Sequence, residues 1–171
     1  MSTHQRALDE YRHRIEAAAI AGLILKPAAI DHVRDWLEPA DFATPHYGDW
    51  YAHLLNMRGR GEPIDQMTLL TALRRADQLG PQGQNADELA TITTSAPVPA
   101  STIEYCRIVL EESIRDEIAS VGVRLSQLAR RSSMDGARLL AQARALTEHG
   151  LRPLEQAQHR SDALISAQQE R

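Results

Sequence analysis

Lysine is almost absent from this sequence. Of the 19 basic residues, 18 are arginine, and the single lysine is Lys26. Lys26 lies between Leu25 and Pro27, so these residues contain no G-x-x-x-x-G-K-[ST] loop. Such a loop holds phosphates with its lysine and a metal ion with its hydroxyl. The sequence therefore excludes P-loop nucleotide hydrolysis, and it excludes Schiff-base chemistry unless Lys26 alone performs it.

Cysteine and long apolar runs are also scarce. Cys106 is the only cysteine, which excludes an internal disulfide or a thiolate zinc site. A single cysteine suits a reducing compartment, so we expect a cytoplasmic protein. Residues 1–10 are polar and lack the apolar core of a signal peptide. The longest apolar run, Ala17–Leu25 with its glycine, is far too short for a membrane span.

What the chain does contain favours helices. Hydrophobic residues make up 43% of the 171 residues and aromatic residues only 4%, while alanine occurs 25 times. This length and apolar content suit one domain with extensions. The net charge of −4 argues against nucleic acid as the main partner.

Apolar residues recur at helical spacing in several short segments before residue 100. Helix-start and helix-stop residues separate these segments, and no run of alternating β-branched residues predicts a strand. The pattern predicts a helix from Tyr11 to Pro27, a second between Ile30 and Pro39, a third from Pro45 to Gly59, a fourth capped by Asp65, and a fifth with a capping box of Asn85 and Glu88.

The pattern changes after Pro99. An apolar stripe steps by three or four residues through Cys106, Leu110, Ile114, Ile118, Val121, Leu125 and Leu128. It predicts one helix of about 30 residues, or ~45 Å. A last helix follows on Ala137, Leu140, Ala143 and Leu146 and stops at Gly150. The expected fold is all-α, a small globular helical head followed by a long αα-hairpin.

We divide the chain into a flexible N-terminus (1–10), a globular head (11–100), a hairpin (101–150) and a polar tail (151–171). The second arm of the hairpin is about half as long as the first, so apolar surface remains for another chain. This predicts a homodimer or a higher homo-oligomer. The expected interface consists of Leu110, Ile114, Ile118, Val121, Leu125, Leu128 and Leu140.

Positive charge gathers at the far end of the hairpin. Residues 121–152 carry six arginines and two acidic residues, whereas the whole chain is acidic. Arginine suits bidentate contacts with phosphate or carboxylate, but no aromatic residues are interleaved for base stacking. The patch is therefore a solvated tip, a protein-binding surface or a weak nucleic-acid site, formed by Arg124, Arg130, Arg131, Arg138 and Arg144.

Other chemistry is weakly indicated. His46, Asp49 and His53 would share one helix face and could hold a metal, but no H-E-x-x-H motif supports this. The carboxylate pairs Glu111–Glu112 and Asp116–Glu117 fit the solvated face of a long helix better than an acid–base site. Cys106 lies on the apolar stripe, as a core thiol would. We expect no catalytic residue, no metal and no cofactor.

Several segments match one protein family in order and at fixed spacing. Glu16–Leu25 resembles an opening E-x-A-x-L-x-G-L-L-L, and R-G-E-P-I-D at 60–65 followed by T-L at 68–69 is close to verbatim. Further matching residues are Pro27, Ile30, Asp31, Val33, Asp35, Leu37, Pro39, Asp41, Phe42, Pro45, Val98, Pro99, Tyr105, Ile108, Val109 and Glu111. Over roughly Arg14–Leu146 the chain resembles the N-terminal collar domain of bacterial DnaB-type replicative helicases.

The resemblance implies an all-α head with a hairpin, pairing through the hairpins into a trimer-of-dimers collar, and a docking surface for primase. Tyr47–Tyr51 departs from the family, which usually has H-R-x-I-F at this place. The tail resembles the start of the helicase linker, and we expect a free-standing domain without the ATPase domain to which that linker leads in the family. We expect a non-catalytic replication protein that binds primase, helicase or a loader. The alternatives are a weak nucleic-acid-binding module and the collar subunit of a split helicase.

Overall fold

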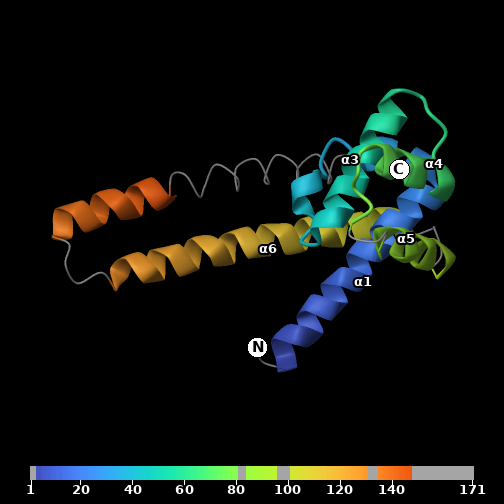
Figure 1. Cartoon of the computed structure of the whole chain (residues 1–171). Coiled ribbons are helices and arrows are strands. Elements are labelled where there is room, and N and C mark those ends of the chain that lie inside the picture. Colours follow the sequence, from blue (N-terminus) through green and yellow to red (C-terminus); the bar gives the residue numbers. More distant parts are fainter. Residues whose placement is uncertain (1–2, 81–83, 96–100, 131–134, 148–171) are drawn as a thin grey trace. The chain divides into compact units, whose positions relative to one another are not determined.

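The computed structural model describes residues 3–80, 84–95, 101–130 and 135–147, and all regular secondary structure in these ranges is helical. The expectation of an all-α fold is confirmed. The chain divides into two compact units, Met1–Leu110 and Glu111–Arg171 (Figure 1). The predicted tail, 151–171, lies outside the described residues.

The first helix, α1 (Thr3–Leu25), begins well before the predicted start at Tyr11. Residues 3–10 contain neither glycine nor proline, so nothing in their backbone chemistry stops the helix from extending towards the N-terminus. The expected flexible start is therefore helical from Thr3 onward. Pro27 then ends the helix as predicted.

Two short turns of helix follow Pro27. The 3₁₀ turn η1 (Pro27–Ala29) leads directly into α2 (Ile30–Val33). A second 3₁₀ turn, η2 (Pro39–Asp41), begins at the proline that was expected to end this segment. Proline suits the first position of each turn because its missing N–H has no partner there.

The three remaining helices of the head are α3 (Pro45–Gly59), α4 (Gln66–Arg75) and α5 (Gln84–Thr94). The predicted cap of α4 is confirmed, because Asp65 Oδ1 accepts a hydrogen bond of 2.8 Å from the backbone N–H of Thr68. This bond stabilises the charged carboxylate and lowers the pKa of Asp65. The capping box predicted for α5 is wrong: Asn85 lies inside the helix, and its side-chain amide donates to the carbonyl of Gln78.

Aromatic side chains from α3 and from the turn after α2 fill the core of the head. Trp36, Tyr47, Trp50 and Tyr51 are each at most 2% exposed. The first residues of α6 (Thr102–Ala129) join this core, since Cys106 is fully buried. Burial raises the pKa of its thiol to about 12, so the expectation of a core thiol is confirmed.

Two glycines allow close approaches inside the head. A Cβ at Gly22 in α1 would lie 2.2 Å from Thr102 Oγ1, and a Cβ at Gly48 in α3 would lie 2.5 Å from the carbonyl oxygen of Pro39. Both distances are far below van der Waals contact. The start of α6 therefore packs on α1, and α3 packs on η2, at separations that only glycine permits.

A buried carboxylate joins α1 to the start of α3. Glu16 is 1% exposed, and its two oxygens accept hydrogen bonds from the backbone N–H groups of Ala43 (2.8 Å) and Thr44 (3.0 Å). Thr44 occupies the N-cap position of α3 but makes no capping bond with its own side chain. Glu16 thus anchors the segment that leads into α3, and a carboxylate is also favourable near the positive end of a helix dipole.

The second unit contains the rest of α6 and a helix over 136–147 that runs antiparallel to α6, as in an αα-hairpin (Figure 1). The helix passes through Gly122 without a break, as predicted. The second arm starts at a cap, because Asp135 Oδ1 accepts from the backbone N–H of Arg138 at 2.9 Å. Among the described residues after Leu110, only Leu128 is buried.

Candidate functional site

The apolar stripe of α6 is partly open to solvent. Ile118 is 53% exposed, and Ile114, Val121 and Leu125 are half-buried. On the second arm Leu140 is 62% exposed. We call Ile114, Ile118, Val121, Leu125 and Leu140 the hairpin surface. Exposed side chains of this size on a hairpin are suited to packing against another polypeptide.

Two residues of the predicted interface are buried. Leu110 is 1% exposed and belongs to the first unit, and Leu128 is 5% exposed within the second. Neither side chain offers area to another chain in this conformation. Sequence periodicity put both on the stripe correctly, but it could not show that the chain itself covers them.

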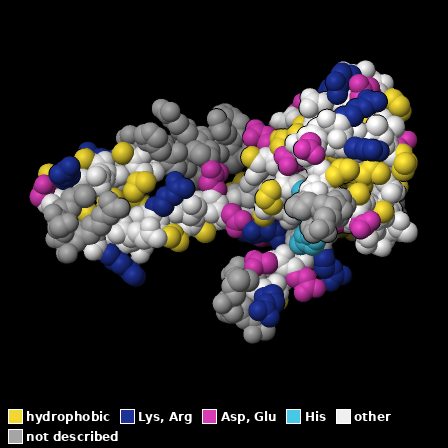
Figure 2. Space-filling view, viewed as in Figure 1, with side chains coloured by type: hydrophobic (Ala, Val, Ile, Leu, Met, Phe, Trp, Pro, Cys, Tyr) yellow, Lys and Arg dark blue, Asp and Glu magenta, His cyan; other side chains and the backbone are white. Residues whose placement is uncertain are grey.

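Val123 is an exposed apolar residue that the stripe did not include. Its side chain is 55% exposed. It lies five positions after Ile118, which places it about 140° around the helix from that residue. Figure 2 shows apolar side chains on the surface of this helix among acidic and basic ones. A single valine outside a periodic stripe gives no sequence signal of its own.

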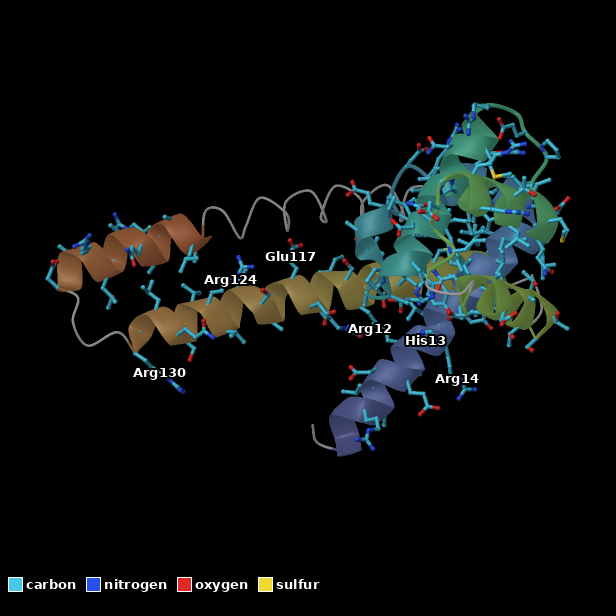
Figure 3. The ribbon with its side chains drawn as sticks, viewed as in Figure 1. Arg12, His13, Arg14, Glu117, Arg124 and Arg130 are labelled. Carbon is cyan, nitrogen blue, oxygen red and sulfur yellow. The ribbon has the colours of Figure 1, made fainter. Side chains whose placement is uncertain are left out.

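The described arginines of the predicted patch, Arg124, Arg130, Arg138 and Arg144, are all exposed. Arg131 lies outside the described residues. Figure 3 shows Arg124 and Arg130 pointing to different sides of α6, as expected for positions six residues apart on a helix. The arginines therefore do not form one continuous face on α6.

Acidic and basic side chains pair along the first half of α6. Arg107 Nε donates to Glu104 Oε2 at 3.0 Å, and Arg115 pairs with Glu112. The Arg107 guanidinium donates hydrogen bonds to the Glu104 carboxylate, and because these bonds stabilise the charged form they lower the pKa of Glu104. These pairs at i, i+3 spacing fit the expectation of a solvated helix face.

Glu88 of α5 gathers side chains from two other helices. Its Oε1 accepts from the Tyr47 hydroxyl at 2.5 Å and lies 3.4 Å from His13 Nε2. His46 Nε2 lies 2.9 Å from Oε2, without the alignment of a hydrogen bond. Burial, together with the Glu88 carboxylate, raises the pKa of Tyr47. The cluster links α1, α3 and α5, and sequence spacing could not reveal it, because its members come from three separate segments.

The histidines that could have held a metal are not brought together. His46 faces Glu88, whereas His53 Nε2 lies 2.6 Å from Gln78 Oε1. Within the described ranges no group of three His, Cys, Asp or Glu side chains has a metal-binding arrangement. The geometry gives the metal interpretation no support.

An ion pair fixes α2 against α3. Arg58 Nε lies 3.1 Å from Asp31 Oδ2, and a terminal nitrogen of the guanidinium contacts the same oxygen. This bidentate contact lowers the pKa of Asp31 and raises that of Arg58. Asp31 is one of the residues that carry the family resemblance, and its observed role is structural.

The head also has an open groove of about 670 Å³ between α1, α5 and the start of α6. Its lining is mainly apolar and includes Tyr11, Ile15, Ile92 and Tyr105, with Arg14 as its single charged residue. All of them belong to the first unit. Sequence reasoning did not identify this groove.

No described helix is long and apolar enough to cross a membrane. Three features of the described residues are suited to contact with another molecule: the hairpin surface, the arginines near the end of α6, and the groove of the head.

Comparison with known proteins agrees with this picture. The sequence model described as DnaB-like helicase N terminal domain matches residues 9–111. The replicative DNA helicase DnaB of Mycobacterium leprae is 31% identical over 112 residues, which are 66% of this chain and 18% of that protein. The DnaB of Leifsonia xyli is 28% identical over 113 residues, or 24% of its length. The chain thus spans about a quarter or less of these relatives.

Solved structures show the same fold. The N-terminal domain of DnaB helicase from Mycobacterium tuberculosis superposes with a TM-score of 0.68 at 29% identity, over 80% of this chain and 95% of that one. The N-terminal domain of DnaB helicase from Helicobacter pylori, described together with its interactions with primase, gives a TM-score of 0.62 at 20% identity, over 77% of this chain and all of that one. The matches therefore concern the N-terminal part of these helicases.

Proposed function

Because the chain belongs to the DnaB-like helicase N-terminal domain family, we propose that it is a non-catalytic interaction module of DNA replication. It self-associates through the hairpin surface and binds primase, the replicative helicase or a helicase loader. Its mechanism is occupancy of a helical surface, and no covalent step is assigned to its residues.

The hairpin surface is the observation that carries this proposal. Ile118 and Leu140 are each more than half exposed, and burying such a side chain contributes about 1.5–3 kcal/mol. Several of them on one hairpin supply the apolar centre that protein interfaces need, with the neighbouring Glu112–Arg115 pair as a polar rim. The family membership makes replication proteins the first partners to test.

Primase is the partner we test first, because the Helicobacter pylori relative is described with its interactions with primase. The full chain is titrated with the helicase-binding domain of the primase, and the mass of the mixture is followed by light scattering. We expect a defined complex whose affinity falls at least about tenfold in Ile118→Glu. Met67→Glu is the matched control, because Met67 is a 64% exposed apolar residue of α4 in the head.

If no complex forms, primase is not the partner. If Ile118→Glu and Met67→Glu bind primase equally well, the hairpin surface is not the binding surface. The same titration with the replicative helicase and with a loader then decides between the partners named above. Failure with all three would remove the proposed function.

The exposed arginines support a second candidate, a weak nucleic-acid-binding module. Such a module would bind nucleic acid with an affinity that falls steeply as the salt concentration rises, because contacts with phosphates release counterions. Arg124→Ala with Arg130→Ala should abolish such binding to a short DNA duplex. Lack of any binding at low salt would exclude this candidate.

A further inference from the structure

We propose that the groove of the head between α1, α5 and the start of α6 is a docking site for an amphipathic helix that carries acidic side chains beside its apolar face. This site is separate from the hairpin surface, and it does not depend on self-association. The partner is defined by its chemistry: a helix with apolar residues at i, i+3, i+4 and i+7 and carboxylates along one edge.

The apolar lining continues beyond the groove along α1. Leu8 and Tyr11 are 47% and 51% exposed, and with Ile15 they follow helical spacing on one face. In Figure 1 the N-terminal half of α1 extends away from the other helices of the first unit. From Leu8 to Ala18 this face is about 15 Å long, which equals roughly three turns of a bound helix. A closed pocket for a small molecule would not continue as an exposed stripe.

Charge selects the kind of helix. Arg14 lines the groove and is exposed, and its guanidinium makes no hydrogen bond or ion pair within the part of the chain that the structure describes. Glu10 lies one turn earlier on α1 but does not pair with it there. Figure 3 shows Arg14 projecting from α1. An available guanidinium beside apolar walls and no carboxylate in the lining is complementary to an acidic partner.

The composition of the lining fits a binding surface. Tyr11 and Tyr105 line the groove together with Arg14, and tyrosine and arginine are among the residue types that most often dominate binding energy at interfaces. An amphipathic helix laid into an apolar groove is a recurring mode of recognition. The groove therefore has the shape, apolar lining and charge that this mode requires.

Two synthetic helical peptides of about 18 residues, a length that exceeds the three turns of the groove face, test the proposal. They share one leucine face and differ only in the flanking residues, which are glutamate in one peptide and lysine in the other. Binding to the full chain is measured by fluorescence anisotropy. We expect the glutamate peptide to bind at least about tenfold more tightly than the lysine peptide.

Charge reversal is the decisive variant. Arg14→Glu should reverse the preference, so that the lysine peptide becomes the tighter ligand. Arg74→Glu is the matched control: Arg74 is an exposed arginine of α4, outside the groove lining, and the variant should keep the original preference. Tyr11→Ala should lower the affinity for both peptides by about tenfold. The melting temperature of each variant verifies that the head remains folded.

The proposal is overturned if neither peptide shows saturable binding, if both bind equally, or if Arg14→Glu and Arg74→Glu have the same effect. It is also overturned if Tyr11→Ala lowers the mass of the chain itself, because a second copy would then occupy the groove. Ile118→Glu should bind the glutamate peptide like the unmodified chain, so failure of the hairpin proposal and failure of this one are distinguishable.

Discussion

The two units of this chain bury their large side chains to very different degrees. In the first unit Trp36, Tyr47 and Trp50 are at most 2% exposed, whereas in the second unit Ile118 and Leu140 are 53% and 62% exposed. The first unit therefore has a complete core of its own. Among its described residues, the second unit has exposed apolar area that contact with another polypeptide would remove from water. Substitutions should act on stability in the head and on association in the hairpin.

The largest effect should come from removing an aromatic side chain from the core of the head. Trp50→Ala would leave a cavity at a fully buried position, at a cost of about 3–5 kcal/mol. The free energy of unfolding, measured by urea denaturation, should fall by that amount. A loss below about 1 kcal/mol would contradict the assignment of a close-packed core.

The next effect concerns the close approach of α1 and α6 in the head. Gly22→Ala would place a Cβ 2.2 Å from Thr102 Oγ1, and such overpacking costs about 1–3 kcal/mol. Thr102→Ala removes the two nearest atoms, so the double variant should lose less stability than the sum of the single variants. Simple additivity would show that the two residues do not touch in solution.

Replacing a glycine of the hairpin by alanine should raise the stability of the protein, whereas the same replacement at Gly22 in the head should lower it. A Cβ at Gly122, in the middle of α6, meets nothing within 4 Å. Gly122→Ala should therefore stabilise this helix by about 1 kcal/mol through helix propensity alone. The helical circular dichroism signal, followed during thermal unfolding, measures this gain in stability. Destabilisation would mean that another chain approaches closely at this position.

Local sequence patterns predicted most elements of this fold. Proline and N-cap signals located the start of α3 and α4, and the periodic stripe located α6, because these features depend on residues within a few positions of each other. The start of α1 was placed too late at Tyr11, because a helix without a stop signal continues as far as the chain permits. The capping role assigned to Asn85 failed because the residue bonds to Gln78 instead.

The contacts that sequence could not reveal join distant segments. Glu16 caps a backbone segment at Ala43 and Thr44, and Glu88 binds Tyr47 of another helix. In the sequence, Glu16 could be recognised only as part of a family motif, and nothing there indicated that its carboxylate binds the backbone of another segment. The same limit applies to the site: spacing placed Leu110 on the stripe, but its burial in the head follows from the fold.

The mass of the full chain in solution over a micromolar concentration series tests the central claim most directly. We expect a dimer or a larger assembly for the unmodified chain and for Met67→Glu, and a monomer for Ile118→Glu combined with Leu140→Glu. The double variant should keep the melting temperature of the head, because both side chains are exposed. A monomeric mass for the unmodified chain at micromolar concentration, or an unchanged assembly in the double variant, would contradict self-association through the hairpin surface.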